Sequence, residues 1–120
     1  MRFDWSATIE GRPSSKKNNR RNFRNVSLPS EAYLKFNKSA LEQLRGQTPD
    51  VPHDGDVIVE VELYLKGRLR QDLDNATSSI LDLLMDARVI ADDDQVIEAH
   101  IYKHRGAADW RSEVHVVSVD

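Results

Sequence analysis

Apolar and polar residues alternate along four segments of the chain, and this pattern predicts four β-strands. The clearest strand is 57–66, where the valines and leucines at odd positions point to one side and Glu60, Glu62 and Lys66 point to the other. The remaining alternating segments, with a turn at 106–109 before the last of them, are 3–9, 95–103 and 112–119.

Two other segments repeat their apolar residues at helical spacing. The first, 31–45, follows Ser30, a good helix cap, and precedes Gly46, which can adopt the left-handed conformation that closes a helix. The second runs for about four turns from Leu73 to Ala87. The order strand, helix, strand, helix, strand, strand predicts one α+β domain over 1–120: a small mixed sheet of about four strands with two main helices packed on one face.

The segment 11–28 has no apolar period and is rich in asparagine, serine and basic residues. We expect it to form a polar loop that is mobile without its partner and that contacts nucleic acid, although it could also be only a solvated loop. It contains no acid, and its basic residues are Arg12, Lys16, Lys17, Arg20, Arg21 and Arg24.

Charge is segregated along the chain, so the formal net charge of −3 is misleading. Between Asp72 and Glu98 there are eight acids and one base, Arg88. A basic arm beside an acidic centre suits a protein that binds phosphates with one part and cations with another. Cysteine is absent, and we find neither a secretory signal nor an apolar run that would span a membrane, so a cytoplasmic location is expected.

The acidic segment contains a candidate metal site. Asp72 and Asp74 are two residues apart where the 57–66 strand leads into the second helix, and in extended backbone both carboxylates would project to one side. Mg²⁺ prefers such oxygen ligands, and a third carboxylate from the turn at 92–94 could join them. The alternative is that Asp72 or Asp74 caps the helix and that 92–94 is a solvated turn.

These residues also carry a resemblance to a known family. Asp72-Leu73-Asp74-Asn75, Ile80-Leu81-Asp82 and Asp92-Asp93-Asp94-Gln95-Val96 resemble the RusA family of Holliday-junction resolvases. The resemblance is specific across 68–103 and weaker before it, where a Pro-Ser stretch with basic and Asn residues at 13–20 also matches. It implies a homodimeric, Mg²⁺-dependent endodeoxyribonuclease, with Mn²⁺ as a substitute, that resolves four-way junction DNA by paired symmetric nicks in recombination and repair.

The resemblance also implies roles for individual residues. Asp72, Asp74 and Asp93 would be the essential carboxylates that hold the metal, and Asn75, Asp92 and Ser78 would lie in the neighbouring shell. Phe23 could wedge or stack at an opened branch point. The candidate phosphate-binding residues are Lys16, Lys17, Arg20, Arg21, Arg68, Arg70 and Lys103.

Two positions depart from the pattern of the family. Members usually carry a lysine where this chain has Ser78, and often a base where it has Gln71. Serine cannot supply the charge of lysine, so the basic role has either moved, for example to Lys103 or Lys16, or catalysis is weak. Two rivals therefore remain: a branched-nucleic-acid binding protein with weak or no catalysis, and a metal-binding interaction module without a nucleic-acid role.

Overall fold

A computed structural model describes residues 2–16, 21–23 and 26–119, with only the backbone described for 21–23 and 26–27. Its strands and helices are β1 (Asp4–Glu10), β2 (Arg21–Phe23), β3 (Val26–Leu28), α1 (Glu31–Gln43), β4 (Val57–Lys66), α2 (Leu73–Asp86), the short 3₁₀ helix η1 (Asp93–Gln95), β5 (Val96–Ala107) and β6 (Arg111–Ser118). All the predicted strands and helices occur in the predicted order, and three short elements, β2, β3 and η1, are added to them.

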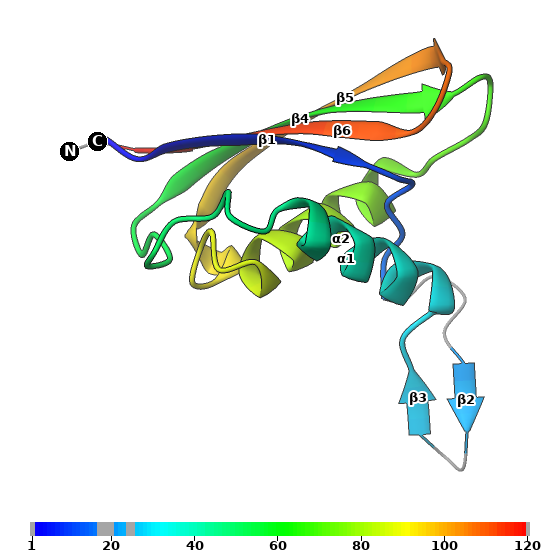
Figure 1. Cartoon of the computed structure of the whole chain (residues 1–120), viewed down its shortest axis with the longest axis horizontal. Coiled ribbons are helices and arrows are strands. Elements are labelled where there is room, and N and C mark those ends of the chain that lie inside the picture. The colour runs from blue at the N-terminus through cyan, green and yellow to red at the C-terminus, as the bar shows by residue number, and fades with distance from the viewer. Residues whose placement is uncertain (1, 17–20, 24–25, 120) are drawn as a thin grey trace.

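A four-stranded mixed sheet forms one layer of the molecule, and α1 and α2 lie together on one side of it (Figure 1). The strand order is β1-β6-β4-β5. β4 pairs with β5 in parallel and with β6 antiparallel, so β4 is internal and β5 forms an edge. The predicted α+β architecture, with four strands and two main helices, is confirmed.

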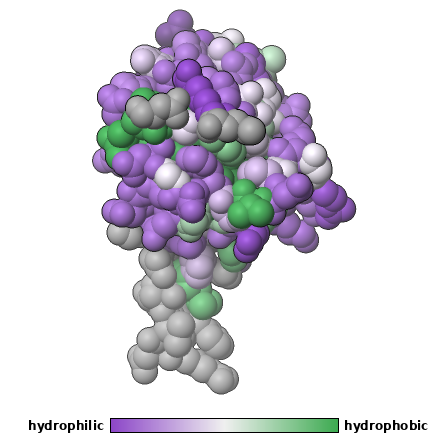
Figure 2. Space-filling model, turned by 90° about the vertical axis from the view of Figure 1, so that its left-hand side faces the viewer, coloured by the Kyte–Doolittle hydropathy of each residue, from purple (hydrophilic) through white to green (hydrophobic). Residues whose placement is uncertain are grey.

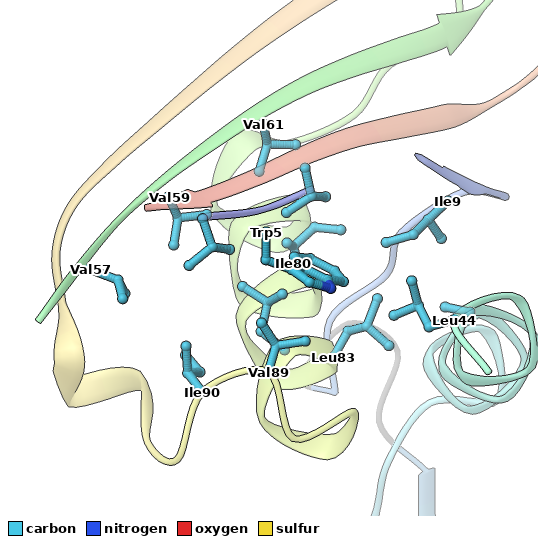
Figure 3. Packing of buried hydrophobic residues seen from close by; sticks show 14 of the residues in the cluster. Trp5, Ile9, Leu44, Val57, Val59, Val61, Ile80, Leu83, Val89 and Ile90 are labelled. Atoms are coloured by element: carbon cyan, nitrogen blue, oxygen red, sulfur yellow. The ribbon is translucent and has the colours of Figure 1, made fainter. Parts of the chain in front are cut away.

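The core lies between this sheet and the helices. All five odd-numbered residues of β4, Val57 to Leu65, are at most 1% exposed, as its alternation predicts. From the other side α2 contributes Ile80 and Leu83, and Trp5 on β1 packs among them (Figure 3). Burying one aliphatic side chain contributes roughly 1.5–3 kcal/mol to the stability of the fold. The packing of these residues therefore fixes the position of α2 under the sheet.

The boundaries of the helices follow local chemistry. The Ser30 hydroxyl accepts a hydrogen bond from the Tyr33 N–H, which caps α1, and Gly46 has a φ of +81° shortly after the helix ends, as predicted. α2 is capped by Asp72 and is followed by Arg88, which adopts a φ of +61°.

The prediction that 11–28 is a loop throughout is wrong in part. β2 and β3 pair antiparallel in a two-stranded ladder that projects from the body below the helices (Figure 1). Three residues per strand are too few to show a periodic pattern in the sequence. Of the predicted DNA contacts in this segment, Lys17 and Arg20 lie outside the described residues, and for Arg21 and Phe23 only the backbone is described.

The last two strands are longer or shifted relative to the prediction. β5 continues to Ala107, because Gly106 and Ala107 remain bonded to Gly67 rather than turning at 106. β6 begins at Arg111, one residue early. Among the described residues, no helix combines the length and the apolar character needed to span a bilayer.

Candidate functional site

Asp72 stands at the amino end of α2, where its side chain accepts a hydrogen bond of 3.0 Å from the Asp74 N–H. The alternative interpretation of Asp72 as a helix cap is therefore confirmed. A carboxylate has about four acceptor positions, so one capping bond leaves most of its capacity unused. Asp74 lies in the first turn and is exposed, as is Asp72. Both carboxylates remain able to bind a cation.

The start of the 11–28 segment holds this helix end in place. The Arg12 Nε donates to the Gln71 side-chain oxygen at 3.0 Å, and the Gln71 amide donates to the Pro13 carbonyl at 3.0 Å. The Ser15 hydroxyl bonds the Asn75 side-chain oxygen at 3.1 Å. Pro13 and Ser15 are buried, so this part of the segment packs against α2.

Gln71, the position where a base is common in the family, is buried and hydrogen-bonded through both its side-chain oxygen and its side-chain nitrogen. Its contact with Arg12 brings a guanidinium to this point instead. Arg12 also donates to the Arg70 carbonyl at 2.6 Å and lies 4.6 Å from the centre of the Trp110 ring, a cation–π distance. A fixed positive charge therefore stands next to the residue that precedes Asp72.

Several basic side chains surround Asp72 in a hollow of about 630 Å³ at the end of β4, which we call the basic hollow. Arg68 and Arg70 reach it from the loop between β4 and α2, and Lys103 reaches it from β5. The structure thus brings three of the predicted phosphate contacts together with one predicted metal ligand. The full lining is Arg68, Arg70, Gln71, Asp72, Lys103 and Arg105.

Arg105 and Arg12 were missed as site residues by the sequence analysis. Arg105 could have been found, because it lies two residues after Lys103 on one strand and so shares its face. Arg12 had no comparable signal, since its position depends on the contact between Gly11 and Trp110, whose backbones bond at 3.1 Å. A second hollow, between the 10–14 segment and α1, shares Arg70, Gln71 and Asp72 with the basic hollow and also includes Asn75.

The second acidic motif lies beyond the other end of α2. Asp92 caps η1 by accepting from the Asp94 N–H at 3.1 Å, and the Gln95 side-chain oxygen accepts from the Asp92 N–H at 2.8 Å. The Gln95 amide donates to the carbonyls of His53 and Gly55 at 2.7 Å, which fixes this turn to the start of β4. Figure 2 views this end of the molecule and shows a mostly hydrophilic surface.

Asp92 and Asp93 interact directly, and their pKa values move apart. Hydrogen bonds from the Asp94 backbone and the Asp93 side chain lower the pKa of Asp92. The same side-chain bond, burial and the charges of Asp92 and Asp94 raise the pKa of Asp93. Crowded carboxylates of this kind favour either a shared proton or a cation.

Asp93 does not meet Asp72 and Asp74 within one chain. Its N–H donates to the Met85 sulfur at 3.3 Å, and the eleven residue steps from Asp74 to Met85 span roughly 16 Å of helix. Among the described residues, no group of three His, Asp or Glu side chains could hold a metal ion. The expected convergence in one chain is therefore wrong, because α2 runs the length of β4 and returns the turn to the opposite end of the sheet.

Between the two ends, α2 presents Ser78 and Asp82. Ser78 is exposed one turn after Asp74, and Asp82 is half-buried one turn further on. Burial and the nearby Asp86 and Asp93 raise the pKa of Asp82, whereas Lys16 opposes this rise. Lys16 also lies 5.4 Å from the centre of the Tyr33 ring, so it stands beside the middle of α2 and not in the basic hollow.

The chain matches the family described as endodeoxyribonuclease RusA over residues 7–117, nearly its whole length. It therefore belongs to the RusA endodeoxyribonucleases, which are Holliday-junction resolvases and metal-dependent nucleases. The match includes both acidic motifs and the basic hollow. No protein of curated function matches the chain.

Proposed function

We propose that this protein nicks four-way DNA junctions symmetrically in recombination and repair, with Asp72, Asp74 and Asp93 as its essential carboxylates. The observation that supports this most directly is the position of Asp72 in the basic hollow, among four cationic side chains from the β4–α2 loop and β5. An acid surrounded by so many cations suits a surface that a phosphate backbone and a metal ion share.

The carboxylates suit a hard divalent ion, Mg²⁺ or, as a substitute, Mn²⁺. Asp72 and Asp74 are exposed and supply oxygen ligands, but the described residues of one chain do not bring in the third. When bound, the ion would stabilise the charge that develops on the scissile phosphate and help to generate the attacking water. The cations of the basic hollow would hold the flanking phosphates.

A site with all three aspartates requires two chains. Because Asp93 lies at the opposite end of α2, the third carboxylate beside Asp72 and Asp74 must be Asp93 of the partner subunit. A two-fold dimer would then carry two equivalent sites. This arrangement agrees with the substrate, since paired cuts in a junction call for two sites related by symmetry.

The neighbouring residues would support this chemistry in different ways. Asn75, which Ser15 holds by a hydrogen bond, would orient a ligand or a water beside Asp72. Asp92 would hold Asp93 in place through their side-chain hydrogen bond. Lys103 in the basic hollow is better placed than Lys16 to replace the lysine missing at Ser78, because it shares that hollow with Asp72.

A labelled four-way junction incubated with Mg²⁺ or with EDTA tests the activity. We expect paired nicks with Mg²⁺ and none with EDTA. Tight, metal-independent binding without nicks would support instead the rival function of a junction-binding protein, which the exposed Ser78 favours.

Mixing two inactive variants tests the shared site. Asp72→Asn and Asp93→Asn should each fail to cut alone. In a mixed dimer, one site would carry both substitutions and the other would have all three native aspartates, so nicking of one strand should return. If subunits exchange and no nicks return, the three aspartates do not form a site across two chains.

A further inference from the structure

The second hollow, between the 10–14 segment and α1, has a volume of about 630 Å³, and we call it the α1 hollow. Cavities of roughly 300–1,000 Å³ typically hold a small organic ligand. One wall is the face of α1 that carries Ala32, Lys35, Phe36 and Ser39, which recur at helical spacing over roughly 10 Å. Another wall comes from the loop between β4 and α2. The α1 hollow is therefore large enough for a ring system of the size of a nucleobase.

Hydrogen bonds hold the walls of the α1 hollow together. The Glu10 N–H donates to the Gln43 side-chain oxygen at 2.7 Å, and the Gln43 amide donates to the Glu10 carbonyl at 2.9 Å, which ties the 10–14 segment to α1. Ser15 accepts from the Ser30 hydroxyl at 3.2 Å through its carbonyl, and its own hydroxyl bonds Asn75 on α2. All three walls are thus joined, so the hollow exists before any ligand enters it.

The α1 hollow combines an apolar surface with polar groups. Gly11 has a φ of +114°, a conformation that favours glycine, and a Cβ at this position would lie 3.5 Å from the Phe36 ring. The missing side chain leaves room over that ring. Lys35 and Asn75 supply hydrogen-bond donors to the lining, and the Glu10 carboxylate supplies acceptors. A nucleobase has matching chemistry, because its faces are apolar and its edge carries donors and acceptors.

The α1 hollow adjoins the proposed site of cutting. It shares Arg70, Gln71 and Asp72 with the basic hollow. A DNA strand whose phosphates lie on the basic hollow therefore passes beside the α1 hollow. Because Asp72 is a proposed metal ligand, a base that enters the α1 hollow would belong to a nucleotide near the phosphate that is cut, an argument that rests on the proposed function.

We propose that the α1 hollow takes up one base of the strand that is cut, after that base has left the stack of the duplex. Enzymes that act on DNA can extrude single bases into a pocket, at a cost that is lowest where pairing or stacking is already disturbed. A branch point interrupts the stacking of the duplexes and so lowers this cost. Capture of the base fixes the neighbouring phosphate relative to Asp72 and makes cutting depend on which base fits the hollow.

A thermodynamic cycle between the base and the hollow tests the proposal. Ala32→Trp places a large side chain in the α1 hollow, and Leu34→Trp, at an exposed position of α1 outside the hollow, is the matched control. Binding is measured in EDTA for an intact four-way junction and for junctions that lack one base at a time around the branch point. One missing base should weaken binding by the unmodified protein about tenfold more than binding by Ala32→Trp. Leu34→Trp should behave as the unmodified protein does.

Ser39→Trp fills the α1 hollow from a position two turns further along the helix, and it replaces Ala32→Trp if a thermal melt shows that the first variant is unfolded. Each missing base having the same effect on the unmodified protein and on the filled variant would overturn the inference, as would failure of the unmodified protein to bind the junction. Deoxynucleoside monophosphates that bind the hollow without this difference would assign it to free nucleotides instead and would also overturn it.

Nicking by the unmodified protein in Mg²⁺ is measured in parallel. A base-dependent difference without nicking would refute the proposed function alone, because the binding measurements need no cutting. Nicking without such a difference would refute the capture of a base alone.

Discussion

Asp74 is the residue at which the proposed chemistry is most directly accessible. It is exposed in the first turn of α2, and its side chain has no part in the capping bond that Asp72 makes. Asp74→Asn should therefore remove the proposed metal ligand with little effect on the fold.

We expect Asp74→Asn to lower the rate of junction nicking by about a hundredfold or more. Binding of the junction should stay equal or become tighter, because a negative charge that faces phosphate is lost. A gel-shift titration and a nicking assay on the same preparation measure both. Nicking at the parental rate would show that Asp74 does not hold the metal.

The backbone conformation of Arg88 leads to a second prediction, which concerns the stability of the fold and not its activity. Its φ of +61° is in the left-handed region, which costs a non-glycine residue energy, whereas Gly46 takes the same region after α1. Arg88→Gly should raise the free energy of unfolding by about 0.5–1 kcal/mol. Denaturant melts check this, and Gly46→Ala, the reverse exchange, should destabilise the protein.

Among the elements, α2 is the most important for the proposed site, because it lies between the two acidic motifs. Asp82 lies on that face, and its raised pKa means that the folded chain disfavours the ionised form. Stability from this group is present below its ordinary pKa of 3.8 and is lost as pH rises through the higher folded value.

Asp82→Asn should therefore raise the melting temperature at pH 7, and the difference should shrink as pH falls toward 4. Thermal melts across this range are the measurement. Asp50→Asn, in an exposed loop, controls for the loss of one negative charge. A variant that is less stable than the parent at pH 7 would mean that the attraction of Lys16 outweighs burial.

The main strands and helices could be predicted because each has a clear period, as in β4, whose bounds match the prediction. The β2–β3 ladder could not, since short strands without apolar alternation resemble a loop. The sequence also identified Asp72, Asp74 and the basic residues around them as a group. It could not place Asp93, because that depends on the direction in which α2 crosses the sheet and on how far it runs.

At the scale of the whole molecule, the basic hollow predicts a strong dependence of junction binding on salt. For every phosphate that the protein ceases to neutralise, the slope of log K against log salt should fall by about 0.9 in magnitude. Replacing Arg68, Arg70 and Lys103 by alanine should therefore reduce that slope by nearly 3. Alanine at Lys38 and Arg45, which are exposed on and just after α1, should leave it nearly unchanged. An unchanged slope in the first variant would exclude these residues from the DNA interface.

The distance between the two ends of α2 has a kinetic consequence. In the proposed shared site, a lone chain would carry two halves of different sites and no whole one, so at high dilution the initial rate of cutting should rise with the square of protein concentration. Once most chains are paired, the rate should become proportional to concentration. A nuclease built as proposed would be inactive at low abundance and would become active as its cellular level rises.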